Sequence, residues 1–329
     1  MKVLLGVISP VAAWNIPRAL VDRIRCDFPE HTFLEAWDRA SIRRLLPEAD
    51  AAFTPLVDRD VLPHAQQLRW VQCPAVGVSH LLYPEMVRSH VVITNARGVR
   101  ARAIAEHVLG VTIALARRFH TAIRHQVAHE WSQDPLENDP VHPIRTLYGC
   151  RLGIVGLGSI GMEIAKVCAA FGFRVSAIRR RVEIAAPDYV DELLPPGRLH
   201  ELLARSDVVV LAAPLTPETR AMIGSRELST MKRDALLVNI GRGALVDDEA
   251  LIDALMNGRL AGAALDVFTE EPLERSSRYW DLPNVLVTPH TSGALQDYWT
   301  PLVDLFANNL RRFEGGQPML NVVDKQAGY

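Results

Sequence analysis

The stretch Gly153-Ile-Val-Gly156-Leu-Gly158-Ser-Ile-Gly161 sets three glycines in the spacing G-x-G-x-x-G. Residues 151–155, which are apolar after Arg151, predict a buried strand that leads into the first of these glycines, and the stretch then opens a segment with helical periodicity. In this context the first glycine permits a tight turn, the second lets a pyrophosphate approach the backbone, and the third allows close helix–strand packing. The N–H groups at the start of the helix can hold the anion. We therefore predict a dinucleotide-binding turn, with an ordinary ligand-free turn as the alternative.

The tip of the next predicted strand indicates which dinucleotide is bound. Residues 174–178 form this strand, and it ends in Arg179-Arg180-Arg181. An enzyme that uses NAD places a carboxylate near this position to accept hydrogen bonds from the ribose 2′-OH. Arginines instead suit a 2′-phosphate, which they bind through charge-assisted, bidentate hydrogen bonds. We expect NADP(H) as the preferred cofactor, with NAD(H) as the alternative. The arginines could also form a solvated basic turn that binds no ligand.

Strands and helices alternate on both sides of the glycine turn, which is typical of parallel βαβ units. The predicted fold is α/β, with two Rossmann-like or flavodoxin-like domains built on doubly wound parallel sheets. A final helix over residues 295–314 can return to the first domain, so the nucleotide-binding domain is inserted in the substrate domain. We expect the substrate domain at residues 1–98 and 294–329, and the NAD(P)-binding domain at 99–293. Between the halves, residues 101–131 predict one long helix and residues 132–146 a loop or arm.

Composition bounds the class of protein. The chain has 329 residues, 49% of them hydrophobic, which suffices for two domains with sizeable cores. Its 36 basic and 38 acidic residues give a net charge of −2, which argues against a uniformly basic nucleic-acid binder. No apolar run is long enough to predict a membrane span. The four cysteines form no CxxC pair, so we expect them to be reduced and the protein to be cytoplasmic.

Three further segments carry more specific information than the glycine turn. They are Val238-Asn-Ile-Gly-Arg242-Gly-Ala-Leu-Val-Asp-Asp-Glu-Ala-Leu251, Gly262-Ala-Ala-Leu-Asp266-Val-Phe-Thr-Glu-Glu271-Pro-Leu273 and Val287-Thr-Pro-His290-Thr-Ser-Gly293. With the glycine turn, and in this order, they strongly resemble the D-isomer-specific 2-hydroxyacid dehydrogenase family. The resemblance extends over essentially the whole chain. It includes Ala105-Glu106-His107, the loop Pro214-Leu-Thr-Pro-Glu-Thr219 and the ending Asn321-Val-Val-Asp-Lys-Gln-Ala-Gly-Tyr329.

The resemblance implies a catalytic set of Arg242, Glu271 and His290, and the chemistry needs these residue types. An arginine fork can hold a substrate carboxylate and polarise a ketone. A histidine can deliver a proton near neutral pH, and an adjacent glutamate favours its protonated form and orients the ring. Taken singly, Arg242 could equally form a surface ion pair, Glu271 could be a solvated loop acid, and His290 could cap the end of a strand.

The resemblance also implies the remaining site residues. The backbone of Val76 and Gly77 would hold the substrate carboxylate together with Arg242 and His290, although an ordinary glycine turn is the alternative there. Asp266 would lie near the nicotinamide carboxamide, unless it only caps a strand end. The full set of expected cofactor contacts is Gly156, Gly158, Ser159, Ile160, Gly161, Arg179, Arg180, Ala213, Pro214, Thr219, Ile240, Gly241, Asp266 and Gly293.

The sequence thus predicts reversible reduction of a small 2-keto acid, such as glyoxylate or hydroxypyruvate, to the D-2-hydroxy acid by NADPH. A nucleotide-sensing corepressor or scaffold with the same fold is the competing hypothesis, and turnover distinguishes the two. His125 and His129 are four residues apart, but they lack the intervening glutamate of a zinc protease, and we expect no metal. In the family the corresponding helix and arm embrace a partner subunit, so we expect a homodimer formed through residues 101–146.

Overall fold

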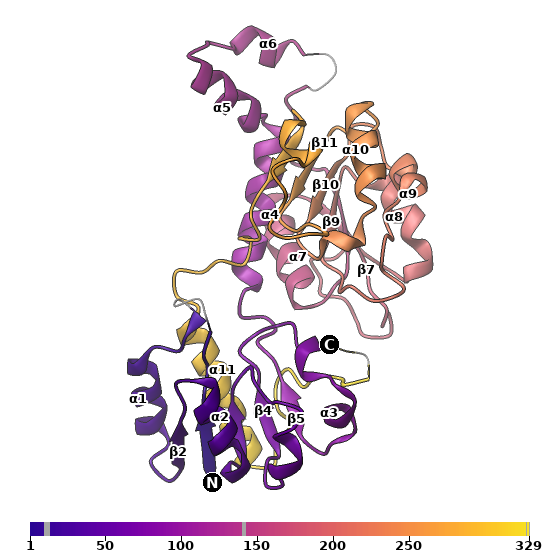
Figure 1. The fold of residues 1–329 in the computed structure, drawn as a ribbon. Helices are drawn as coiled ribbons and strands as arrows, with labels where there is room; N and C mark the ends of the chain where they lie inside the picture. Colours follow the sequence, from indigo (N-terminus) through magenta and orange to yellow (C-terminus); the bar gives the residue numbers. More distant parts are fainter. Residues whose placement is uncertain (10–13, 140–142, 327, 329) are drawn as a thin grey trace. The chain divides into compact units, whose positions relative to one another are not determined.

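A computed structural model describes residues 1–9, 14–139, 143–326 and 328. The chain divides into two units: unit 1 is Met1–Val99 with Leu295–Tyr329, and unit 2 is Arg100–Ala294. In Figure 1 the indigo and yellow segments, from the two ends of the sequence, belong to unit 1, and the chain between them forms unit 2. Each unit is built on one wholly parallel sheet, with five strands in unit 1 and seven in unit 2. The predicted α/β fold, with one domain inserted in the other, is confirmed.

The sheet of unit 2 has the strand order β12-β11-β10-β9-β6-β7-β8. The chain builds outward from β6 in one direction and then restarts at β9 on its other side. The strand order therefore reverses between the neighbouring strands β6 and β9. Open α/β sheets bind ligands at the carboxyl ends of the strands at such a switch point. The strands are β6 (Arg151–Val155), β7 (Arg174–Ile178), β8 (Glu192–Leu194), β9 (Val208–Leu211), β10 (Leu236–Asn239), β11 (Gly262–Leu265) and β12 (Val285–Val287).

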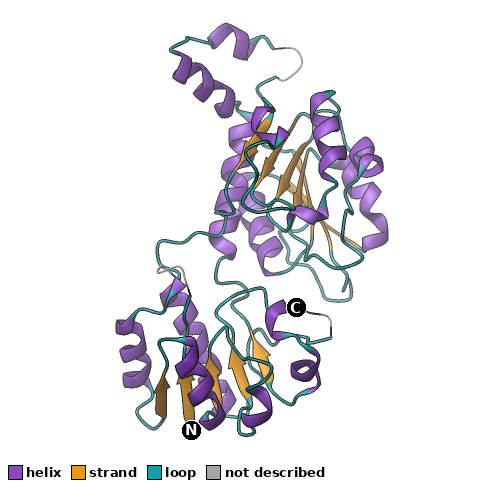
Figure 2. Cartoon of the chain, viewed as in Figure 1, coloured by secondary structure: helices purple, strands orange, loops and turns teal. Residues whose placement is uncertain are grey.

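Both faces of this sheet are covered by helices (Figure 2). Along β9 the side chains alternate, because successive strand residues point to opposite faces. Val208 and Val210 pack in one core cluster, and Val209 and Leu211 pack in the other. The first cluster contains α4 (Ala101–Ala116) and α7 (Ser159–Phe171), and the second contains α8 (Leu199–Arg205), α9 (Ser225–Thr230) and α10 (Asp248–Met256). Short 3-10 turns lie at η5 (Pro196–Arg198), η6 (Gly243–Leu245) and η7 (Arg278–Asp281).

The prediction of one helix over residues 101–131 is wrong. Helix α4 ends at Ala116 because Arg118 adopts a left-handed conformation, with φ of 57°. The Arg145 N–H donates to the Ala116 carbonyl at 2.9 Å and so satisfies the end of α4. A separate helix follows, α5 (Phe119–Ala128), and the expected loop contains α6 (Gln133–Glu137). Residues 140–142 of the predicted arm lie outside the described residues.

Unit 1 has the strand order β2-β1-β3-β4-β5. Its core is fixed by Phe306, which is fully buried and stacks on Phe53 and Trp70 with ring centroids 4.7 and 5.4 Å away. Phe306 lies on the last helix, which begins at Trp299 rather than at residue 295. The elements are β1 (Lys2–Leu5), α1 (Arg18–Asp27), β2 (Thr32–Glu35), α2 (Arg39–Leu45), η2 (Leu46–Glu48), β3 (Ala51–Phe53), η3 (Leu62–His64), β4 (Trp70–Gln72), η4 (Ser79–Leu81), α3 (Pro84–Arg88), β5 (Val92–Thr94) and α11 (Trp299–Glu314). None of the helices that the structure describes has the length and apolar character needed to cross a membrane.

Candidate active site

The glycine turn has the geometry that the sequence predicts for it. Gly156 has φ of 105°, which favours glycine, and a Cβ at Gly161 would lie 2.1 Å from the Gly156 carbonyl oxygen. Helix α7 therefore starts close against β6, with Gly158 as its N-cap. A Cβ at Gly158 would meet nothing within 4 Å. The turn leaves an open approach to the first N–H groups of α7, where a phosphate binds favourably.

Each predicted cofactor residue lies after the carboxyl end of a strand of unit 2. The strands concerned are neighbours in the sheet, from β7 on one side to β12 at the opposite edge. Because parallel strands point the same way, these residues share one edge of the sheet. After β6 come Gly156, Gly158, Ser159, Ile160 and Gly161; after β7, Arg179 and Arg180; after β9, Ala213, Pro214 and Thr219; after β10, Ile240 and Gly241; after β11, Asp266; and after β12, Gly293.

Arginines occupy the tip of β7. The half-buried Arg179 donates from Nε to the Arg181 carbonyl at 2.8 Å and from its guanidinium to the Ile184 carbonyl, so it shapes its own loop. Arg180 is exposed. The pKa of Glu218 is lowered chiefly by its hydrogen bond with Thr216 and to a smaller extent by the charge of Arg180. Arg180 therefore lies close enough to the loop after β9 for its charge to act on Glu218.

His290 and Glu271 form a close pair. The Nδ1 atom of His290 lies 2.7 Å from Oε2 of Glu271, and Oε1 of the same carboxylate accepts from the Phe268 N–H at 3.0 Å. Both side chains remain partly exposed. With Nδ1–H held by the carboxylate, the Nε2 atom of the ring is the one left to exchange a proton with a substrate.

Glu271 is ionised in this setting. Burial raises the pKa of its carboxyl group, but three interactions outweigh burial and bring the pKa below its usual value. They are the hydrogen bond from His290, the Phe268 N–H and the positive charge of Arg242. The ionised carboxylate therefore accepts the Nδ1–H of the His290 ring and fixes the orientation of the ring.

Arg242 is exposed in the turn after β10. Its Nη1 donates to the Gly241 carbonyl at 2.7 Å. The turn itself is held by Asn239, which is buried, donates from Nδ2 to the Arg242 carbonyl at 3.0 Å and accepts from the Gly241 N–H at 3.1 Å. Sequence reasoning did not assign a role to Asn239, although it lies within the segment that carries Arg242.

Asp266 has a structural role, which agrees with the alternative of a strand-end cap given above. The side chain is 1% exposed, and its carboxylate accepts from the Thr288 hydroxyl at 2.6 Å, the Thr291 N–H at 2.8 Å and the Ser292 N–H at 3.0 Å. Its carbonyl accepts from the His290 N–H at 2.9 Å. These four bonds hold His290 in a left-handed conformation, with φ of 55°. The expected contact of Asp266 with the nicotinamide carboxamide stays a prediction.

His107 contacts the loop that leads from β12 to His290. Its Nε2 is 3.4 Å from the Thr288 hydroxyl oxygen. Burial lowers the pKa of His107, and the charge of Asp266 opposes this effect only in part. His107 is therefore neutral near pH 7 and acts as a hydrogen-bonding partner of the loop. It belongs to the Ala105-Glu106-His107 motif, for which the sequence had suggested no role of its own.

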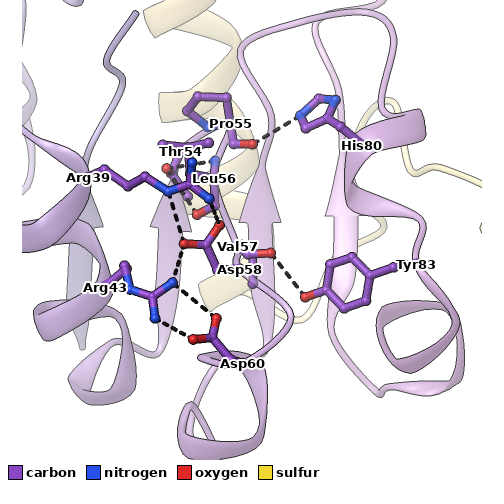
Figure 3. Close-up of polar contacts among 10 residues, drawn as sticks. All are labelled: Arg39, Arg43, Thr54, Pro55, Leu56, Val57, Asp58, Asp60, His80 and Tyr83. Carbon is purple, nitrogen blue, oxygen red and sulfur yellow. Dashed lines mark hydrogen bonds and ion pairs between the residues drawn. The ribbon is translucent and has the colours of Figure 1, made fainter.

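In unit 1 the predicted substrate residues Val76 and Gly77 are exposed in the loop after β4. The loop after the neighbouring strand β3 is tied down from several sides (Figure 3). His80 donates from Nε2 to the Pro55 carbonyl at 3.0 Å, and the Tyr83 hydroxyl donates to the Val57 carbonyl at 3.1 Å. Asp58 accepts from Arg39 and Arg43 of α2, at 2.6 and 2.7 Å. The Arg39 guanidinium holds the pKa of the Asp58 carboxyl below its usual range.

Neither His125 nor His129 belongs to a group of three close metal-ligating side chains in the part of the chain that the structure describes. Nδ1 of His125 lies 2.8 Å from Oε2 of Glu130. Among the described residues, the only group of three close metal-ligating side chains is Glu30, His31 and Glu314 of unit 1. This group includes none of the residues that the sequence predicts for the site.

The fold of unit 2, with its glycine turn and the His290–Glu271 pair on one sheet edge, defines a class of protein, the dinucleotide-dependent dehydrogenases. Comparison with known proteins agrees. A family model described as "D-isomer specific 2-hydroxyacid dehydrogenase, NAD binding domain" matches residues 109–292. The glyoxylate reductase of Thermococcus gammatolerans is 37% identical over 321 residues, which is 94% of each chain.

Solved structures match over nearly all of both chains. A D-isomer-specific 2-hydroxyacid dehydrogenase of Xanthobacter autotrophicus Py2, in complex with NADPH and MES, has a TM-score of 0.82 at 30% identity and covers 100% of this chain and 99% of its own. An NADPH-dependent glyoxylate/hydroxypyruvate reductase of Sinorhizobium meliloti, in complex with NADP and sulfate, has a TM-score of 0.78 at 27% identity, with the same coverage. The chain belongs to the D-isomer-specific 2-hydroxyacid dehydrogenase family, and it is an NAD(P)-dependent 2-hydroxyacid dehydrogenase.

The His290–Glu271 pair predicts a change in the pH profile. In Glu271→Gln a neutral amide replaces the negative charge beside Nδ1 of His290, so the upper pH limit for 2-keto acid reduction should move downward. The measurement is kcat/KM against pH for the parent and the variant. Glu270→Gln, at the adjacent exposed acid, is the matched control and should leave the profile in place. A profile that Glu271→Gln does not move would show that the pair has no part in proton transfer.

Proposed function

We propose that the protein reduces small 2-keto acids, such as glyoxylate or hydroxypyruvate, to the D-2-hydroxy acid with NADPH as the preferred reductant, and that the reaction is reversible. The observation that carries this proposal is the 2.7 Å contact between His290 and Glu271 at the same sheet edge as the glycine turn and Arg242. The identity of 37% with a glyoxylate reductase supports the substrate class.

The proposed roles follow from the geometry of unit 2. The bound nicotinamide supplies the hydride. Arg242 holds the carboxylate of the substrate and polarises the ketone, since its charged fork is exposed at the end of β10. His290 donates the proton from Nε2 to the developing alkoxide, and Glu271 keeps the ring oriented and protonated until transfer.

We propose unit 1 as the substrate domain, in which the backbone N–H groups of Val76 and Gly77 bind the substrate carboxylate. Unit 2 is proposed to bind the cofactor through the complete set of strand-end residues described above. The pyrophosphate would bind at the start of α7, and Arg179 and Arg180 would bind the 2′-phosphate. The complexes of two solved relatives with NADPH and NADP support this choice of cofactor.

The activity predicts a set of variant effects. The parent should oxidise NADPH when glyoxylate or hydroxypyruvate is added. His290→Ala should lower kcat/KM by about 10²–10⁴-fold. Arg242→Ala should act mainly by raising KM for the keto acid. His64→Ala and Arg233→Ala, at exposed positions, are the matched controls.

Two results would contradict this assignment. A variant at His290 or Arg242 with the rate of the parent would remove that residue from the mechanism. Tight NADPH binding without oxidation by glyoxylate or hydroxypyruvate would favour the nucleotide-sensing hypothesis instead.

The arginines at the tip of β7 predict a preference between cofactors. One charge-assisted hydrogen bond is worth about 1.5–3 kcal/mol. Two such bonds to the 2′-phosphate should favour NADPH over NADH by roughly 100-fold or more in kcat/KM, at about 1.4 kcal/mol per tenfold. The ratio should shrink with added salt, because the charges are partly exposed.

The test of this preference is the double variant Arg179→Asp with Arg180→Ala, which should abolish or reverse it. The control is Arg174→Ala, at the exposed start of the same strand, which should leave the ratio unchanged. Equal kcat/KM for NADH and NADPH in the parent at low ionic strength would overturn the proposal and leave a solvated basic turn.

We further propose a homodimer formed through the arm of unit 2. Helix α5 has no buried residue, yet it presents Phe119, Ile123 and Val127 on one face, with exposed fractions of 49, 57 and 77%. Trp131, just beyond it, is 91% exposed. Arg124 anchors the helix by donating to the Pro283 carbonyl at 2.8 Å. Figure 1 shows α5 and α6 standing away from the sheet of their unit. A contiguous apolar surface of this kind is typical of an interface.

The dimer predicts the mass in solution. Light scattering after gel filtration should give twice the chain mass of 36.5 kDa for the parent. Val127→Asp combined with Trp131→Ser should give the mass of one chain. Val182→Asp places a charge on another exposed valine and should leave the dimer intact. A monomeric parent, or a double variant that still dimerises, would exclude this interface.

A further inference from the structure

In the loop that follows β4, four successive backbone carbonyls are each held by a separate donor from unit 1. No two of them share a donor, and all four donors come from outside the loop. The Cys73 carbonyl accepts from Gln72 Nε2 at 3.1 Å, the Pro74 carbonyl from the Tyr298 hydroxyl, the Ala75 carbonyl from the Ala96 N–H at 3.1 Å, and the Val76 carbonyl from Asn95 Nδ2 at 2.8 Å.

This arrangement fixes the direction of the N–H groups. The peptide bonds of the loop are trans, and in a trans peptide the C=O and N–H groups point to opposite sides. The N–H groups of Val76 and Gly77 therefore point away from Ala96 and Asn95. Both residues are exposed. Among the residues that the structure describes, none accepts a hydrogen bond from either N–H, whereas the Ala75 N–H reaches the Cys73 sulfur. Two adjacent outward N–H groups can bind an anion.

The direction of the Gly77 N–H depends on the side chain of Asn95, which holds the carbonyl of the same peptide. Asn95 follows β5, the neighbour of β4, and is 3% exposed. Its Oδ1 accepts from the Arg97 N–H at 3.2 Å, so the amide cannot turn over without losing both bonds. Asn321 secures its backbone: the Asn95 N–H donates to the Asn321 carbonyl at 3.2 Å, and Asn321 Nδ2 donates to the Asn95 and Arg97 carbonyls at 3.3 and 2.7 Å.

We propose that Asn95 is a positioning residue for substrate binding: by holding the Val76 carbonyl inward, it directs the Gly77 N–H toward the substrate carboxylate. The proposal rests on the proposed function, which assigns that carboxylate to the loop of Val76 and Gly77. Asn95 acts through the peptide that it holds and does not itself touch the substrate.

The first test separates KM from kcat. In Asn95→Ala the Val76–Gly77 peptide is free to rotate, and a hydrogen bond to a charged group is lost. The KM for glyoxylate should rise about tenfold or more, while kcat and the KM for NADPH change little. Asn284→Ala is the matched control, because Asn284 is 9% exposed and its Nδ2 donates to the Leu255 carbonyl in unit 2. It should lower thermal stability and leave the KM for glyoxylate unchanged.

The second test uses Asn95→Asp, which has the same shape. As a carboxylate it repels the Val76 carbonyl, but a buried carboxyl group retains its proton at higher pH than an exposed one. The protonated O–H can donate to Val76. The ratio of KM in this variant to KM in the parent, measured at each pH, should therefore fall toward one as pH is lowered. A side chain that only filled space would give a ratio independent of pH.

Oxalate binding by calorimetry, in the presence of NADPH, distinguishes this proposal from the proposed function. If the parent turns over and Asn95→Ala keeps the KM of the parent, the role of Asn95 is wrong and the function stands. If the parent reduces no keto acid, the function fails, and oxalate decides the role of Asn95. Weaker oxalate binding in Asn95→Ala than in the parent supports the role, whereas equal binding, or none in the parent, overturns it. Circular dichroism checks that each variant is folded. If Asn95→Ala does not fold, the pH dependence of the KM ratio in Asn95→Asp tests the role of Asn95 in its place.

Discussion

Parallel pairing of the seven strands of unit 2 is the constraint on which the site depends. It places every carboxyl end on one edge, so that turns far apart in the sequence meet there. Gly156, Arg242, Asp266 and His290 follow β6, β10, β11 and β12 in this way. A one-residue shift in register would turn every side chain of a strand to the other face. The alternating core residues on both faces, such as Val208 and Val209, therefore fix the position of the site as well as the fold.

Buried polar side chains then set the conformation of each turn. Asp266 holds the loop of His290, Asn239 holds the turn of Arg242, and Asn95 holds the loop of Val76. A buried polar group is costly when it lacks a partner, so each of these side chains has a strong preference for the turn that satisfies it. The groups that would meet substrate stay exposed, while the groups that orient them lie within the protein. This division lets an exposed histidine keep a left-handed backbone conformation without a glycine.

The sequence predicted well those features that depend on local pattern. The strands Arg151–Val155 and Arg174–Ile178 and the glycine turn were predicted with the bounds observed, because buried parallel strands are continuous apolar runs. The helix over residues 101–131 was predicted wrongly, since its break at Arg118 depends on a backbone conformation that arginine seldom adopts. The edge strand β8 and helix α3 were missed, because each is short and only partly buried. The partners of Asp266 and Asn95 lie in other turns, and no spacing in the sequence indicates which turns they hold. Asn239 bonds within its own turn, but an asparagine at the end of a strand is not by itself a signal for this role.

The reaction proposed for this sheet edge transfers a hydride directly from NADPH to the ketone carbon of a 2-keto acid. The most direct measurement supplies NADPH that carries deuterium at the transferred C4 position, with hydroxypyruvate as the acceptor. The product is then resolved by chiral chromatography and mass spectrometry. The expected product is D-glycerate with one deuterium at C2. Unlabelled product, the L enantiomer, or cofactor that is bound but never oxidised would contradict it.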